Sequence, residues 1–222
     1  MPEPNIIGRR AMLLGGAVVV TGAASAAVAL PVPSGGSLAF RMVRHGSEIG
    51  THALTFSHDG EMLTVRIVVD ALVTFASIPI ARYSHRGVET WRDATLVQLT
   101  GDTDKNGTRN WVHAQRTDEG LVVLGSQTKR YISPGAAIPT SYWNKRMLDG
   151  PMISLEDGVL LSPKVADLRM ESVRLASGQM ISADHYSLTG AFAVDLWYDE
   201  QRTWAGMAMT VVDGSEVHYE RL

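Results

Sequence analysis

The sequence has 222 residues, of which 45% are hydrophobic and 19% charged, and it carries a formal net charge of −3 and no cysteine. This composition is typical of a globular protein and excludes a chain that is mainly disordered. The missing thiol excludes disulfides, thiolate catalysis, iron–sulfur clusters and cysteine-ligated zinc. A nucleic-acid partner is not expected, because a duplex DNA binder needs a basic surface to displace counterions.

The N-terminal segment has the composition of an export signal. Arg9 and Arg10 precede an uncharged stretch, residues 11–30, that is rich in Ala, Gly and Val. The paired arginines resemble a twin-arginine signal, and small-residue cleavage motifs lie near the end of the stretch. We therefore expect a signal peptide at residues 1–29, a periplasmic location and one mature domain at residues 30–222 without a permanent membrane span. An uncleaved N-terminal anchor is the alternative.

Period-two alternation is the main secondary-structure signal of the mature chain. Every second residue from Leu63 to Phe75 is apolar, and polar side chains such as Arg66 and Asp70 lie between them. This pattern is typical of a β-strand. The predicted strand is far longer than usual, so we expect it to coil, and a sheet of such strands to curl into a half-barrel.

Turn signals divide the rest of the chain into further short alternating segments. Asp59-Gly60 and Asn106-Gly107 are examples, and glycine suits such turns because it accepts a positive φ. The pattern predicts about ten to twelve strands with short connections, which favours antiparallel pairing over crossover helices. The predicted fold class is mainly β, with a curled antiparallel sheet that forms a half-barrel or open barrel.

One segment interrupts the β pattern and predicts a short helix. Thr140 is a suitable N-cap, residues 141–148 have helical spacing, and Gly150 is a stop signal. Trp143 and Met147 are four residues apart, so they share one helix face. We expect this helix to lie across the mouth or the open side of the curled sheet.

No motif identifies a catalytic or metal-binding site. Residues 102–107 resemble the opening of a calcium loop, but the twelfth position is His113 instead of glutamate, which favours a polar hairpin tip. The seven histidines show no zinc spacing, and the chain has no G-x-S-x-G, P-loop or dinucleotide fingerprint. We therefore assign no catalytic residue, metal or cofactor.

Two aromatic segments, residues 142–144 and residues 195–199, are the more informative candidates for a binding site. In the segment 195–199, alternation puts Trp197 on one strand face with Asp195, while Leu196 and Tyr198 lie on the other face. An indole beside carboxylates suits the rim of a ligand pocket, whereas the alternative is an indole that covers one end of the sheet beside a solvated edge. The candidate ligand-binding residues are Tyr142, Trp143, Asn144, Met147, His185, Asp195, Trp197 and Tyr198.

The segments T-S-Y-W-N at 140–144 and D-L-W-Y-D at 195–199, with Gly46-x-x-x-Gly50, resemble an uncharacterised family of exported bacterial proteins. The likeness covers residues 38–219, and the family is a domain of unknown function. It is similar in layout to periplasmic lipoprotein carriers, which implies a curved antiparallel sheet around a hydrophobic cavity closed by short helices. The resemblance implies no activity and no catalytic residues.

Three functions remain open from the sequence. The leading hypothesis is a non-enzymatic periplasmic protein that binds or carries an apolar, lipid-like ligand inside the sheet, with Trp143 and Met147 closing the cavity. The second is a periplasmic hydrolase or isomerase of lipid-like substrates that uses His185 with Asp195 or Asp199. The third is a structural partner in a cell-envelope assembly, which predicts a large exposed apolar patch.

Overall fold

The computed structural model describes residues 30–75, 78–211 and 213–222, so the predicted signal peptide lies outside the described residues. The described chain folds into a 13-stranded sheet, a 3-stranded sheet and one short 3₁₀ helix. The elements are β1 (Ser37–Arg44), β2 (Ser47–Asp59), β3 (Met62–Phe75), β4 (Ile78–Arg92), β5 (Thr95–Lys105), β6 (Thr108–Thr117), β7 (Gly120–Gly125), β8 (Thr128–Ser133), β9 (Ile138–Pro139), η1 (Lys145–Asp149), β10 (Met152–Ile153), β11 (Leu160–Leu161), β12 (Lys164–Arg174), β13 (Met180–Thr189), β14 (Val194–Tyr198), β15 (Trp204–Thr210) and β16 (Glu216–Arg221). The prediction of a mainly β protein is confirmed, but the predicted ten to twelve strands are too few, because the described residues form β1 to β16.

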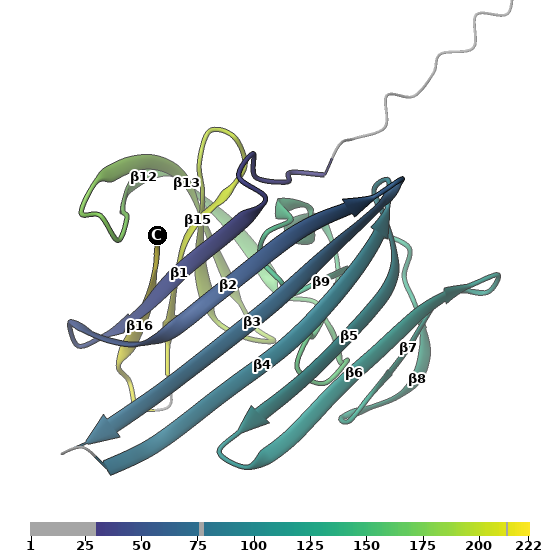
Figure 1. Ribbon diagram of the computed structural model, residues 1–222, viewed down its shortest axis with the longest axis horizontal. Helices are drawn as coiled ribbons and strands as arrows, with labels where there is room; N and C mark the ends of the chain where they lie inside the picture. The colour runs from purple at the N-terminus through teal and green to yellow at the C-terminus, as the bar shows by residue number, and fades with distance from the viewer. Residues whose placement is uncertain (1–29, 76–77, 212) are drawn as a thin grey trace, which may run out of the picture.

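The large sheet consists of two antiparallel meanders joined by the first and last strands. Its order is β12-β13-β14-β15-β16-β1-β2-β3-β4-β5-β6-β7-β8, so β12 and β8 are its edges. The join pairs Met42 of β1 with Tyr219 of β16. In Figure 1 the sheet is strongly twisted and curved, and β9 with its neighbouring loops lies behind β2 to β5.

The long alternating strand is confirmed as β3, which has 14 residues and pairs along its length with β2 and β4. Leu63, Val65, Ile67 and Val69 are buried on its inner face, and Arg66 is exposed on the other face. Burial of one face fixes the register, because a slip by one residue would expose every buried side chain.

The predicted helix over residues 141–148 is wrong in type and length. Within residues 140–150 the only helix is η1, and Asn144 is its N-cap, whose side chain accepts a hydrogen bond from the Arg146 backbone N–H. Thr140 instead bonds to the small sheet, because its N–H donates to the carbonyl of Ile153. Tyr142 has a φ of 65°, a left-handed conformation that cannot continue an α-helix.

Two glycines let the segment between β10 and β11 approach the inner face of the large sheet. A Cβ at Gly101 would lie 2.4 Å from the Leu155 carbonyl oxygen, and one at Gly125 would lie 1.9 Å from the Asp157 carbonyl oxygen. Both distances are far below van der Waals contact, so only glycine permits this packing. The segment is thereby held against β5 and β7, where Leu155 and Asp157 form part of a cavity wall.

Replacing Gly125 by alanine is therefore expected to lower the free energy of unfolding by about 2 kcal/mol, since the added methyl must displace backbone. Chemical denaturation measures this change. Gly135→Ala is the matched control, because a Cβ at Gly135 meets nothing within 4 Å and should leave stability unchanged. Equal stability of the two variants would contradict the close approach.

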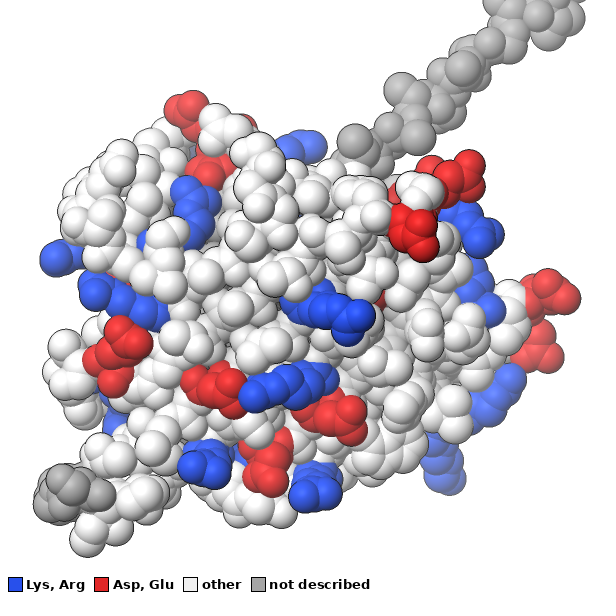
Figure 2. Space-filling model, in the orientation of Figure 1, with Lys and Arg blue, Asp and Glu red and all other residues white. Residues whose placement is uncertain are grey.

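Acidic and basic side chains are mixed over the outer face that β2 to β6 present in Figure 2. An example is the pair formed by Arg86 and Asp70, in which both carboxylate oxygens accept from Nη2 at 3.0 and 2.9 Å. No helix in the described part of the chain has the length and hydropathy needed to cross a bilayer.

Candidate functional site

A cavity of about 860 Å³ lies on the inner face of the large sheet. One wall consists of inward-facing residues of β3 and β15, such as Ile67, Val69 and Met207. The opposite wall is the segment held by the glycines, including Leu155. Apolar side chains therefore dominate the lining, as is usual for sites that bind small molecules.

The open end of the cavity lies where several hairpins end. Ile80 at the start of β4, Lys105 at the end of β5 and Asp213 after β15 line this end and are exposed. Arg44 of β1 also lines this end of the cavity. Its guanidinium donates hydrogen bonds to the Asp213 carboxylate and to the Ser215 hydroxyl, the latter at 2.7 Å. The mouth is thus rimmed by charged groups around an apolar interior.

A row of side chains across β2 to β5 forms the deep end. The strand register places His52 beside Val69, Val69 beside His85, and His85 beside Thr103. Next to this row, Leu54 is fully buried and does not line the cavity, whereas Ile67 is almost fully buried and still lines it. The row therefore places two imidazoles, those of His52 and His85, in the cavity wall.

Both histidines of this row are buried and neutral. His85 Nδ1 lies 2.8 Å from the Thr103 hydroxyl, whereas neither ring nitrogen of His52 has a hydrogen-bond partner among the described residues. Burial, with a smaller contribution from His85, lowers the pKa of His52 to about 3. Burial, assisted by Arg86, lowers the pKa of His85 to about 4. At neutral pH the deep end therefore carries no imidazolium charge.

Glu89 holds together the closed core below the cavity. Its Oε2 accepts hydrogen bonds from the indoles of Trp91 at 2.8 Å and Trp143 at 2.9 Å. Burial raises the pKa of the Glu89 carboxyl, and the hydrogen bonds from Trp143 and Trp91 offset this only in part. The carboxyl thus links β4 to the loop that carries Tyr142 into the cavity wall.

The structure divides the first aromatic segment between the cavity and the core. Tyr142 lines the cavity. Trp143 and Met147 are fully buried in the core and do not line it, so they do not form a lid. Asn144 is buried as the N-cap of η1.

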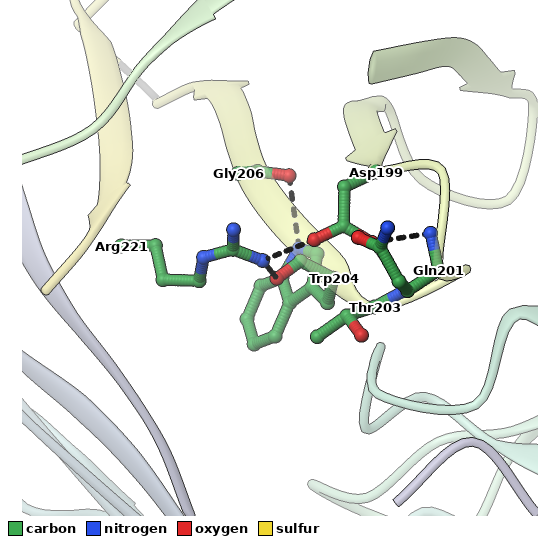
Figure 3. A network of polar contacts seen from close by, with 6 residues as sticks. All are labelled: Asp199, Gln201, Thr203, Trp204, Gly206 and Arg221. Carbon is green, nitrogen blue, oxygen red and sulfur yellow. Dashed lines mark hydrogen bonds and ion pairs between the residues drawn. The ribbon is translucent and has the colours of Figure 1, made fainter. Parts of the chain in front are cut away.

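The second aromatic segment supports the cavity from outside its wall. The Tyr198 hydroxyl donates to the Tyr142 carbonyl oxygen at 2.8 Å and so fixes the position of Tyr142. Asp199 closes the turn before β15: it accepts from Arg221 Nη1 at 2.8 Å and from the Thr203 N–H at 2.9 Å (Figure 3). This network orients Trp204, whose ring lies 5.3 Å from that of Tyr142.

His185 lies in a separate cluster on the other face of β13 and β14. Its Nε2 is 3.1 Å from Asp195 Oδ1, its Nδ1 is 3.3 Å from Glu171 Oε1, and its ring stacks on Trp197 at 4.6 Å. The Trp197 indole also donates to Glu171 at 2.6 Å. The structure therefore brings the predicted residues His185, Asp195 and Trp197 together, but none of the three lines the cavity.

The calcium-like segment is the tip of the β5–β6 hairpin. Asn106 and Gly107 have φ values of 55° and 85°, and the Asp104 side chain accepts a hydrogen bond from the Gly107 N–H at 2.7 Å. Within the described ranges, the structure has no group of three or more His, Cys, Asp or Glu side chains arranged to hold a metal ion.

Sequence reasoning missed several polar residues of the inner face. His52, His85 and Glu89 occupy inward positions of β2 and β4, and Tyr83 and Glu156 line the cavity. The first three carry a recognisable signal, since they are polar residues in the apolar phase of alternating strands. Glu156 carries none, because it lies in a loop whose approach depends on distant glycines.

Comparisons with known proteins agree with this fold. No curated protein matches the chain. A β-barrel-like protein of domain of unknown function DUF1849 from Brucella abortus, solved by crystallography, is similar in structure with a TM-score of 0.57 and 11% sequence identity. The match covers 84% of this chain and 95% of that chain. The model of the domain of unknown function DUF6134 matches residues 40–222, and the chain belongs to this family.

Proposed function

We propose that this protein is a periplasmic, non-enzymatic binding protein or carrier that holds one lipid-like ligand in the cavity of a half-barrel. The observation that carries the proposal is the cavity of about 860 Å³, lined mainly by apolar side chains. This volume is within the range of sites that bind small molecules. The signal-like residues 1–29 support export, and the curved sheet supports the carrier-like layout.

The expected affinity follows from the hydrocarbon that the cavity buries. Each methylene removed from water contributes about 0.8 kcal/mol, so a ten-carbon chain gains about 8 kcal/mol before the costs of association. Those costs reduce the net value, which places the dissociation constant at about 1 μM or weaker. An affinity in this range suits reversible loading and release.

Blocking the cavity tests the proposal. Ala71 lines the cavity on β3, so Ala71→Trp is expected to weaken binding of 1-decanol at least about tenfold, because the indole occupies the space of the chain. Isothermal titration calorimetry measures the binding. Leu72→Trp is the matched control: Leu72 is the next residue, does not line the cavity and is exposed, so binding should persist. Failure of the wild-type protein to bind 1-decanol would contradict the proposal.

A hydrolase or isomerase is the second candidate, favoured by the 3.1 Å separation of His185 Nε2 and Asp195 Oδ1. Two observations count against it. Both ring nitrogens of His185 already face carboxylates, because Nδ1 lies near Glu171, and neither His185 nor Asp195 lines the cavity. An enzyme of this kind converts its substrate, whereas a carrier returns its ligand unchanged. Mass spectrometry of ligands recovered after incubation with the protein separates the two functions.

A docking role in an envelope assembly is supported by a different surface. Leu168, Met170 and Met180 expose large apolar side chains on the β12–β13 hairpin, and β12 is an edge strand. Exposed apolar edges are characteristic of surfaces that pair with another chain. Such a role is compatible with a carrier that delivers its ligand to a partner.

A further inference from the structure

Glu156 lies among tyrosines in the cavity wall. Tyr83 of β4, Tyr142 and Tyr219 of β16 line the cavity together with Glu156. The Tyr83 hydroxyl donates to Glu156 Oε1 at 3.0 Å. Burial, and secondarily the charge of Glu156, raises the pKa of Tyr83 and Tyr142. Burial also raises the pKa of Tyr219, with smaller contributions from Tyr142 and then Glu156. All three rings are therefore neutral, and all lie within electrostatic reach of the same carboxylate.

This carboxylate has no positive partner in the described part of the chain. None of the ion pairs there includes Glu156. Of the Arg and Lys residues that line the cavity, Arg44 is paired with Asp213, whereas Arg82 and Lys105 are exposed and form no ion pair with Glu156. Glu156 is half-buried and its Oε1 accepts from a phenol hydroxyl, so the carboxylate retains acceptor capacity for a cationic group.

The surrounding rings also favour a cation. The rings of Tyr83, Tyr142 and Tyr219 line the cavity, whereas Trp204 is fully buried and does not line it, with its ring centroid 5.3 Å from that of Tyr142 and 6.2 Å from that of Tyr219. Faces of tyrosine and tryptophan attract ammonium groups through their negative quadrupole, and the attraction increases when the cation is desolvated. Aromatic faces and a carboxylate together make a suitable environment for an alkylated ammonium group.

We infer that the ligand is a cationic amphiphile, whose ammonium group contacts Glu156 among Tyr83, Tyr142 and Tyr219 while its hydrocarbon chain lies along the apolar wall. This inference rests on the proposed function, because it assigns the ligand class of the same cavity. Two exposed cations that also line the cavity, Arg82 and Lys105, would instead favour an anionic head group.

Three probes with the same ten-carbon chain and different head groups test the inference: decyltrimethylammonium, 1-decanol and decanoate. Each is titrated by calorimetry below the concentration at which it forms micelles. Decyltrimethylammonium is expected to bind about tenfold more tightly than 1-decanol, and decanoate is expected to bind more weakly than either. If 1-decanol does not bind, the proposed function fails; if 1-decanol binds but the cation has no advantage, only the inference fails.

Glu156→Gln isolates the carboxylate. The amide oxygen can still accept from Tyr83, so the fold is expected to persist, and the advantage of decyltrimethylammonium over 1-decanol should disappear while 1-decanol binding remains. Glu200→Gln is the matched control, since it removes the same charge from an exposed residue that does not line the cavity. Retention of the tenfold preference in Glu156→Gln would overturn the inference, as would tighter binding of decanoate to the wild-type protein.

Discussion

Replacing Glu89 by alanine is expected to lower the free energy of unfolding by about 4 kcal/mol. The substitution leaves the buried indole N–H groups of Trp91 and Trp143 without their acceptor and opens space in the core. Because Trp143 is adjacent to Tyr142, the cavity wall should loosen as well. Denaturant titration measures the loss, and a change below about 1 kcal/mol would contradict the role of Glu89.

Glu89→Gln keeps an acceptor oxygen and removes the ionisable group, so it serves as the control. Burial raises the pKa of Glu89 in the folded state, so its contribution to stability is complete below its ordinary pKa and is lost as the pH rises toward the folded value. The free energy of unfolding of Glu89→Gln, relative to that of the wild type, should therefore increase with pH by up to about 1.4 kcal/mol per pH unit. If the relative stability of Glu89→Gln instead decreased with rising pH, the folded protein would stabilise the charged form of the Glu89 carboxyl.

Removing His52 is expected to protect the fold against acid. Burial lowers the pKa of His52 to about 3, against an ordinary value of 6.5, so its stabilising contribution is present above pH 6.5 and is lost as the pH falls toward 3. His52→Phe keeps an aromatic ring beside Trp204 and Tyr219 and cannot be protonated. Between pH 7 and pH 4 the wild type should therefore lose about 3 kcal/mol more free energy of unfolding than His52→Phe. Chemical denaturation of both proteins at the two pH values measures this difference.

His58→Phe is the matched control for this experiment. His58 lies on β2 like His52, but it is exposed. Its ring contacts water in the folded and unfolded states, so the substitution should leave the response to acid unchanged. Equal acid sensitivity of His52→Phe and wild type would mean that the imidazole of His52 reaches solvent in the folded protein.

The strands were predictable from the sequence because burial acts on each of them locally. β3 alternates because one face is buried, and that alternation identifies the strand without knowledge of its partners. The failed helix shows the limit. Residues 141–148 have helical spacing, but Thr140 is bound to β10 and Tyr142 has a positive φ, and both depend on a sheet formed elsewhere in the chain.

The candidate site was predictable only in part, for the same reason. Tyr142 and Trp143 are adjacent and chemically similar, yet one lines the cavity and the other is bonded to Glu89, 54 positions away. Alternation correctly grouped Asp195 with Trp197, but it could not show that His185 and Glu171 complete that cluster outside the cavity. Side-chain roles that depend on long-range pairing have no local signal.

Native mass spectrometry of protein purified from the periplasm without detergent tests the central claim most directly, because it reports bound molecules and stoichiometry together. The proposed function predicts one lipid-like molecule per chain, removed by organic extraction and absent from Ala71→Trp. A bare polypeptide mass from every preparation, together with no uptake when 1-decanol is offered to the extracted protein, would contradict it.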